Sequence, residues 1–216
     1  PRHSRGRGRT ARGRVVTPLG EFMRVLGIDP GLTRCGFGVV DGGPARSARL
    51  AGVGVITSQR DQGVDMRLLE IYRGLTHVIE QYAPDMVAIE RVFSQNNVST
   101  VMGTAQVSGL AIVLAAERRI PVAMHTPSEV KRAITGNGRA DKAQIQNMVQ
   151  KLLHLDAPPK PADAADAVAI AMTQLWRGSG PVKLGSDGAR RTSAQAQWAE
   201  AERKARRAQE NSTSRL

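Results

Sequence analysis

The chain has 216 residues, of which 41% are hydrophobic, and its 31 Lys and Arg against 19 Asp and Glu give a formal net charge of +12. This composition suits one soluble domain with tails and excludes a membrane span, because no run approaches the roughly 18 consecutive apolar residues required. The single cysteine, Cys35, excludes an internal disulfide, and with no signal-peptide pattern at the start it predicts a cytoplasmic location.

Two basic segments flank the middle of the chain. Residues 1–22 contain six Arg and one acid, and residues 178–216 contain eight bases and four acids. Both are poor in apolar residues, which predicts a disordered N-terminal extension and a C-terminal tail that is disordered or partly helical. The extension is either a nucleic-acid-binding arm or sequence upstream of the working protein, since Met23 stands just before the first expected strand. The excess positive charge indicates a polyanionic partner such as nucleic acid, or serves solubility.

Three strands and a helix are expected at the start of the middle region. The expected strands are 25–28, 35–41 and about 50–57. The first strand runs into the turn Asp29-Pro30-Gly31, and Gly42-Gly43-Pro44 gives the signal of a hairpin between the next two. Apolar residues between 68 and 82 recur at helical spacing, which predicts an amphipathic helix ending before Pro84.

Helices and strands alternate in the rest of this region. The expected strands are 86–89 and 121–125, and the expected helices are 98–118, one starting near 126, 145–153 and 162–176. Thr126-Pro127-Ser128-Glu129 combines an N-cap, a Pro at N1 and a Glu at N3, which is typical of a helix start. Three leading strands followed by this alternation predict an α/β fold with a mixed sheet covered by helices on both faces.

Four carboxylates fall where such a fold binds ligands. Asp29 and Glu90 each follow a strand, and ligands of open α/β sheets bind at that end. Asp163 and Asp166 share one face near the start of the last helix, whose alanines predict close packing on the sheet and partial burial of the acids. Burying an unpaired charge costs several kcal/mol, whereas the helix dipole contributes only about 0.3–1 kcal/mol, so a cation is expected. Taken singly, each acid also fits an ordinary turn or a first-turn helix acid.

These carboxylates favour one class of chemistry. A site made of carboxylate oxygens suits Mg²⁺ or Mn²⁺, and no His or Cys spacing typical of zinc competes. Two such ions about 3.5–4 Å apart would activate a water and stabilise the leaving 3′ oxygen of a phosphodiester. The sequence therefore predicts nuclease chemistry.

Four motifs carry a resemblance that covers about residues 23–177. They are MRVLGIDPGLTRCG at 23–36, AIERVF at 88–93, TPSEVK at 126–131 and ADAADA at 162–167. In this order they closely resemble RuvC, the family of bacterial Holliday-junction resolvases. The resemblance implies a nuclease domain over 23–177 with a ribonuclease-H-like, five-stranded mixed sheet flanked by helices. It also implies a homodimer that makes paired, symmetric cuts at four-way DNA junctions in recombination and repair, leaving 5′-phosphate and 3′-hydroxyl nicks.

The resemblance also implies the ligands and partners of the site. The implied catalytic and metal-binding residues are Asp29, Glu90, Asp163 and Asp166. They would hold two Mg²⁺ ions per subunit, with Mn²⁺ as a substitute. The implied partners are the four-way junction, a second copy of the chain, and a branch-migration motor made of RuvA and RuvB, with no membrane.

Further residues are expected to contact DNA. They are Phe93, Lys131, Lys142, Arg91 and Arg139. The resemblance implies that Phe93 stacks on a junction base and that the two lysines lie near the scissile strand, whereas residue type alone also suits a core Phe and solvated lysines. The turn 136–139 offers backbone N–H groups to phosphates, although Gly136 equally suits a helix C-cap.

Three other functions fit parts of the pattern. A kinase or ATPase of the actin-like superfamily shares the sheet order and a phosphate loop similar to 27–31, but about 155 structured residues leave no room for its second domain. A DNA-architectural protein on the same fold is expected to have lost one of the acids. A nuclease for ribosomal RNA precursors is expected to have a different first loop.

Overall fold

The computed structural model describes residues 23–91 and 98–177, and these contain a five-stranded mixed sheet. Its strands are β1 (Met23–Asp29), β2 (Arg34–Gly42), β3 (Ala48–Thr57), β4 (Met86–Glu90) and β5 (Val122–His125). They lie in the order β3-β2-β1-β4-β5. The first three strands pair antiparallel, and β4 runs parallel to both β1 and β5. The mixed sheet and all five expected strands are thus confirmed, with ends that move by up to about two residues, which is within the usual ambiguity of boundaries.

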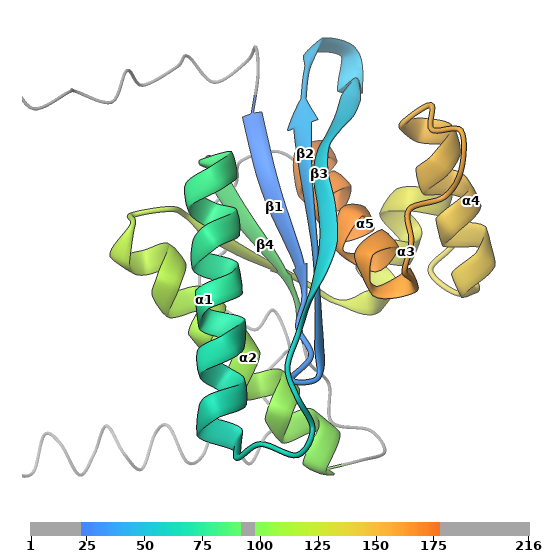
Figure 1. The fold of residues 1–216 in the computed structure, drawn as a ribbon. Helices are drawn as coiled ribbons and strands as arrows, with labels where there is room; N and C mark the ends of the chain where they lie inside the picture. Colours follow the sequence, from blue (N-terminus) through green and yellow to red (C-terminus); the bar gives the residue numbers. More distant parts are fainter. Residues whose placement is uncertain (1–22, 92–97, 178–216) are drawn as a thin grey trace, which may run out of the picture. The chain divides into compact units, whose positions relative to one another are not determined.

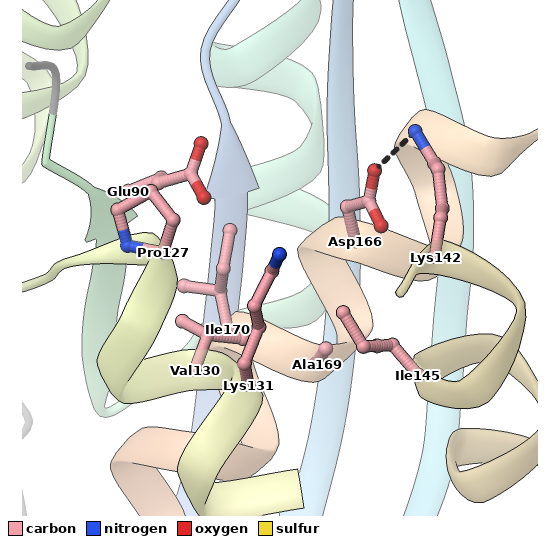
Figure 2. Close-up of a pocket in the computed structure, with 9 residues that line it drawn as sticks. All are labelled: Glu90, Pro127, Val130, Lys131, Lys142, Ile145, Asp166, Ala169 and Ile170. Atoms are coloured by element: carbon pink, nitrogen blue, oxygen red, sulfur yellow. Dashed lines mark ion pairs between the residues drawn. The ribbon is translucent and has the colours of Figure 1, made fainter. Parts of the chain in front are cut away.

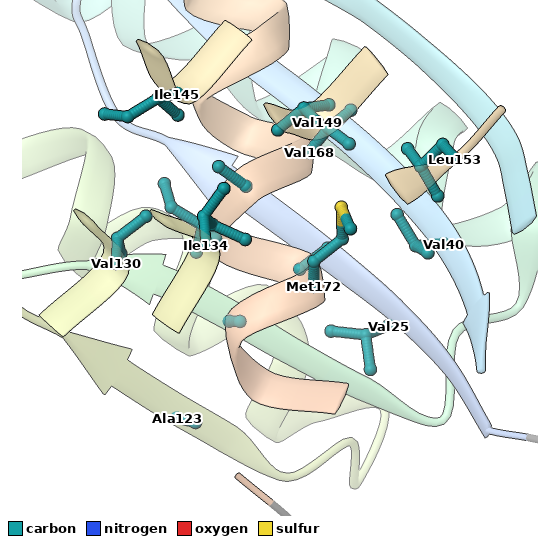
Figure 3. Packing of buried hydrophobic residues seen from close by; sticks show 14 of the residues in the cluster. Val25, Val40, Ala123, Val130, Ile134, Ile145, Val149, Leu153, Val168 and Met172 are labelled. Atoms are coloured by element: carbon teal, nitrogen blue, oxygen red, sulfur yellow. The ribbon is translucent and has the colours of Figure 1, made fainter. Parts of the chain in front are cut away.

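Helices cover both faces of the sheet (Figure 1). They are α1 (Val64–Tyr82), α2 (Val98–Glu117), α3 (Pro127–Thr135), α4 (Lys142–Leu152) and α5 (Ala162–Arg177). On one face, Leu26 and Ile28 of β1 are buried with residues of α1 and α2, such as Leu75 and Leu114. On the other face, α5 lies against the sheet, and α3 and α4 pack over it through a second cluster (Figure 3). None of the helices within the described part of the chain is long and apolar enough to cross a membrane.

Strand alternation decides which face receives the acids. Side chains of a strand point to opposite faces in turn, so residues two apart share a face. Val25 of β1 and Ala88 of β4 belong to the cluster on the α5 face, whereas Ile28 and Ile89 belong to the cluster beneath α1 and α2. Continuing the alternation by one residue places Asp29 and Glu90 on the α5 face.

Helix α5 lies unusually close to the sheet because glycine and alanine stand at the contact. A Cβ added at Gly36 would lie 2.1 Å from the carbonyl oxygen of Asp163, and one added at Gly27 would lie 2.1 Å from that of Ala167. The helix has small buried residues along its length, and of these Ala164, Ala167 and Ala171 meet the strand glycines. The close packing expected from the alanines is confirmed, and it brings the backbone of Asp163 onto β2.

The two short helices begin at capping boxes. At α3, the Thr126 side chain accepts from the Glu129 N–H while the Glu129 side chain accepts from the Thr126 N–H, as the sequence predicts. At α4, Asp141 and Gln144 form the same reciprocal pair, so the helix begins at Lys142, earlier than its apolar stripe indicates. Gly136 adopts φ of 77° and caps the C-terminus of α3, which confirms the C-cap interpretation.

Candidate metal centre and nuclease site

Three carboxylates from distant parts of the chain meet at one edge of the sheet. Asp29 ends β1, and Asp163 and Asp166 project from the first turns of α5. One carboxylate oxygen from each lies within 4.8 Å of the others, and all three residues are half-buried. Oxygens on opposite sides of a bound Mg²⁺ lie roughly 4.2 Å apart, which is twice the usual bond length. This carboxylate cluster (Asp29, Asp163 and Asp166) therefore suits a divalent cation.

Glu90 lies beside the carboxylate cluster and is not one of its three members. It ends β4, whose register with β1 pairs Ile28 with Ile89, so Glu90 is level with Asp29 on the neighbouring strand. Glu90 and Asp166 line opposite sides of a cavity of about 200 Å³ (Figure 2). Acids from both the sheet and α5 therefore line this cavity.

Burial and mutual repulsion disfavour the charged forms of these acids. Burial, followed by the negative charges of Glu90 and Asp166, raises the pKa of Asp29 to about 7. Burial, followed by the charge of Asp166, raises the pKa of Glu90 as well. A divalent cation would reverse both effects, because it stabilises the ionised carboxylates and releases their protons.

Two cations already offset part of the negative charge. The Arg34 Nε donates to Asp163 Oδ2 at 2.6 Å, and the Lys142 Nζ lies 2.8 Å from Asp166 Oδ2 (Figure 2 shows the second pair). The hydrogen bond to Asp166 raises the pKa of Lys142. Lys142 is the first residue of α4, where the helix dipole disfavours a cation, and Asp166 supplies a partner within the protein. Sequence reasoning missed Arg34, whose partner lies 129 residues away.

Lys131 lies on α3, near the acids of the site. It is the fifth residue of this nine-residue helix. It lines the same cavity as Glu90, Asp166 and Lys142. The cavity wall between these charged groups is apolar, with Val130 and Ile170 among its residues (Figure 2).

The other residues that are expected to contact DNA lie in different surroundings. In the turn after α3, the Asn137 N–H donates to Thr135 Oγ1 and the Arg139 N–H donates to Asn137 Oδ1, so these two N–H groups are already engaged. The exposed Arg139 side chain is left as the candidate phosphate contact of this turn. The Arg91 N–H donates to the His125 carbonyl at 2.7 Å, which holds the residue beside the end of β5. Phe93 and the segments 1–22 and 178–216 lie outside the described residues.

The sheet is ribonuclease-H-like, and its carboxylates lie at the ends of β1 and β4 and at the start of α5. This fold and this site together define a nuclease of the metal-dependent class. The model of the family "Crossover junction endodeoxyribonuclease RuvC" matches residues 25–174. The chain belongs to this family.

Curated relatives agree with this assignment over most of their length. The crossover junction endodeoxyribonuclease RuvC of Paenarthrobacter aurescens is 55% identical over 185 residues, which cover 86% of this chain and 98% of the relative. That of Streptomyces avermitilis is 60% identical over 155 residues, covering 72% and 88%.

Solved structures give the same result for the fold. Thermus thermophilus RuvC, solved in complex with a Holliday junction substrate, matches with a TM-score of 0.67 and 34% identity over 70% of this chain and 92% of that one. The yeast mitochondrial Holliday junction resolvase matches with a TM-score of 0.54 over 74% and 80%, but at 15% identity it supports the fold alone.

Proposed function

We propose that this protein resolves four-way (Holliday) DNA junctions by metal-dependent phosphodiester hydrolysis in DNA recombination and repair. The meeting of Asp29, Asp163 and Asp166 within 4.8 Å carries this proposal, in a family whose T. thermophilus member was solved on such a junction. Glu90 extends the site across the neighbouring cavity. Attack of water on the phosphodiester would leave a 5′-phosphate and a 3′-hydroxyl.

The four acids are our proposed ligands for two Mg²⁺ ions, with Mn²⁺ as a substitute. Their donor atoms are all carboxylate oxygens, which these ions prefer, and burial disfavours their charged forms unless a cation is present. When bound, the ions would supply the activation of water and the stabilisation of the leaving oxygen. The chain's own contribution is to hold the acids in place, through the sheet for Asp29 and Glu90 and through α5 for the other two.

Cations around the acids are our proposed contacts to the DNA backbone. Lys131 and Lys142 line the cavity that Glu90 and Asp166 also line, which supports a role in neutralising phosphates next to the scissile bond. Arg139 and Arg91 are further candidates at the periphery. We keep Phe93 as the proposed residue that stacks on a junction base, on the strength of its position three residues after Glu90 in the family motif.

The proposed assembly follows from the symmetry of the substrate. A two-fold dimer would place one site on each of two equivalent strands, so that two symmetric cuts resolve the junction. A branch-migration motor of RuvA and RuvB is the proposed partner, and the cytoplasm is the proposed location. We propose 23–177 as the nuclease domain, flanked by the basic segments 1–22 and 178–216.

The decisive experiment is cleavage of an end-labelled, immobile four-way junction, beside a linear duplex and a single strand, with Mg²⁺ and with EDTA. We expect symmetric, metal-dependent cuts confined to the junction. Asp163→Asn should abolish them but retain junction binding, because it removes a ligand and a negative charge near phosphates. Cutting of RNA or linear DNA instead would move the substrate, and junction binding without cutting would contradict the proposed nuclease.

A further inference from the structure

Arg34 contacts the carboxylate cluster, and the proposed nuclease function gives this contact no role. It is the first residue of β2, and its Nε donates to Asp163 Oδ2 at 2.6 Å. The side chains of Arg34 and Asp163 are 45% and 30% exposed, so both remain accessible to solvent. The pair joins residues 129 positions apart and exists through the packing of α5 on the sheet.

The position of Arg34 follows from the same alternation that places the acids. Arg34 and Gly36 are two apart on β2 and share a face, and Gly36 lies directly beneath the backbone of Asp163. The Arg34 side chain consequently rises beside the first turn of α5. Because β2 begins where the antiparallel β1 ends, this turn is also the edge of the sheet that carries Asp29.

The charges at this edge of the sheet indicate how Arg34 affects metal binding. When ionised, the carboxylate cluster carries three negative charges, and Arg34 and Lys142 each place one positive charge at hydrogen-bond distance from one member. A divalent ion that binds Asp163 must compete with the guanidinium for the negative charge of that carboxylate. Lys131 lines the neighbouring cavity but forms no ion pair with any residue in the described ranges, so its charge does not compete for a particular oxygen.

We propose that Arg34 is a positioning residue that occupies Asp163 in the metal-free protein and competes with the divalent ion for that carboxylate. It holds the Asp163 side chain at the edge of the sheet before the metal arrives, and it raises the metal concentration at which the site fills. This inference rests on the proposed metal site. In this proposal the four acids provide the affinity for the metal, and Arg34 lowers that affinity.

The test is the affinity of the full chain for Mn²⁺, measured by titration calorimetry without DNA. Arg34→Gln keeps a neutral hydrogen-bond donor but removes the charge, and we expect it to bind Mn²⁺ about two- to fivefold more tightly, the range expected for losing one exposed ion pair. Arg34→Lys should restore much of the wild-type affinity. Lys131→Gln removes the same charge from the neighbouring cavity and should change the affinity less. A fold that is merely damaged would bind Mn²⁺ more weakly, which is the opposite sign.

Thermal unfolding supplies a second readout. Arg34→Gln should lower the melting temperature of the metal-free protein, because Asp163 loses its counter-ion, and should enlarge the rise that saturating Mn²⁺ produces. If the wild type binds Mn²⁺ and Arg34→Gln binds it equally or more weakly, the competition is refuted while the metal site stands. Equal tightening by Arg34→Gln and Lys131→Gln would also refute it, since general charge would then suffice. A wild type that binds no Mn²⁺ would overturn the metal site itself.

Discussion

Replacing Gly36 with Ala should separate Asp163 from the other acids of the carboxylate cluster without changing any side chain of the cluster. Gly36 lies on β2 beneath the first turn of α5, and a Cβ there would stand 2.1 Å from the Asp163 carbonyl oxygen. Both atoms belong to backbone or are bonded to it, so no side-chain rotation relieves the contact. Either α5 lifts at its N-terminus, which moves Asp163 away from Asp29, or β2 recedes at Gly36, whose partner in the antiparallel pair is Asp29 itself.

The size of this movement follows from the contact distance. Cβ atoms essentially never approach another heavy atom within 3.0 Å, so the two backbones must separate by about 0.9 Å or more. Overpacking of this kind costs about 1–3 kcal/mol of stability. Misplacing a catalytic group by about 1 Å can cost roughly 100-fold in rate, and here the displaced residue is itself a proposed metal ligand. We therefore expect cleavage by Gly36→Ala to fall by about two orders of magnitude, with weaker Mn²⁺ binding.

Single-turnover cleavage of a synthetic junction, measured beside urea denaturation, checks both numbers. Gly109→Ala is the matched control, because Gly109 is exposed on α2 and an added Cβ meets no atom within 4 Å. This control should gain up to about 1 kcal/mol from helix propensity and cleave at the wild-type rate. If Gly36→Ala bound Mn²⁺ and cleaved like the wild type, close packing of α5 would not be what positions Asp163.

Two further predictions concern pH and helix capping. Because the pKa of Asp29 is raised from 3.8 to about 7, its contribution to the stability of the metal-free protein is full below about pH 4 and is lost as the pH rises through 7. Denaturation curves without metal should show this loss, Asp29→Asn should reduce it, and saturating Mg²⁺ should oppose it. Thr126→Ala removes one half of the α3 capping box and should cost about 1 kcal/mol. Since α3 carries Lys131, thermal unfolding and cleavage should be measured together, and an unchanged melting temperature would contradict the capping role.

The parts of the site that sequence predicts are those fixed by local rules. Asp29 and Glu90 follow short apolar runs, and the end of a strand is where open α/β sheets bind ligands, so their position follows once the strands are assigned. Asp163 and Asp166 lie on a helix whose alanines indicate its close approach to the sheet. In each case a few neighbouring residues contain the necessary information.

The parts that sequence does not predict depend on contacts between distant residues. The partner of Arg34 lies 129 residues away, and that of Lys142 lies on another helix, so no periodicity indicates either ion pair. The sequence predicts Glu90 as a metal ligand equivalent to Asp29, Asp163 and Asp166. Its position beside the other three acids, however, depends on where α5 crosses the sheet. The sequence feature that bears on Arg34 is its spacing of two residues from Gly36. This spacing indicates a position near Asp163 only when α5 is known to lie above Gly36.

Gly27 of β1 and Gly31 of the following turn also bear on the rival interpretation as an actin-like ATPase. That interpretation rests on the similarity of residues 27–31 to a phosphate-binding loop. In this structure, a Cβ at Gly27 would meet the Ala167 carbonyl oxygen at 2.1 Å, and a Cβ at Gly31 would meet the Arg34 carbonyl oxygen at 2.3 Å. Both glycines are therefore required by contacts within the protein. The same sequence that resembles a phosphate loop instead lets α5 and the start of β2 approach β1, and this approach assembles Asp29 with the acids of α5.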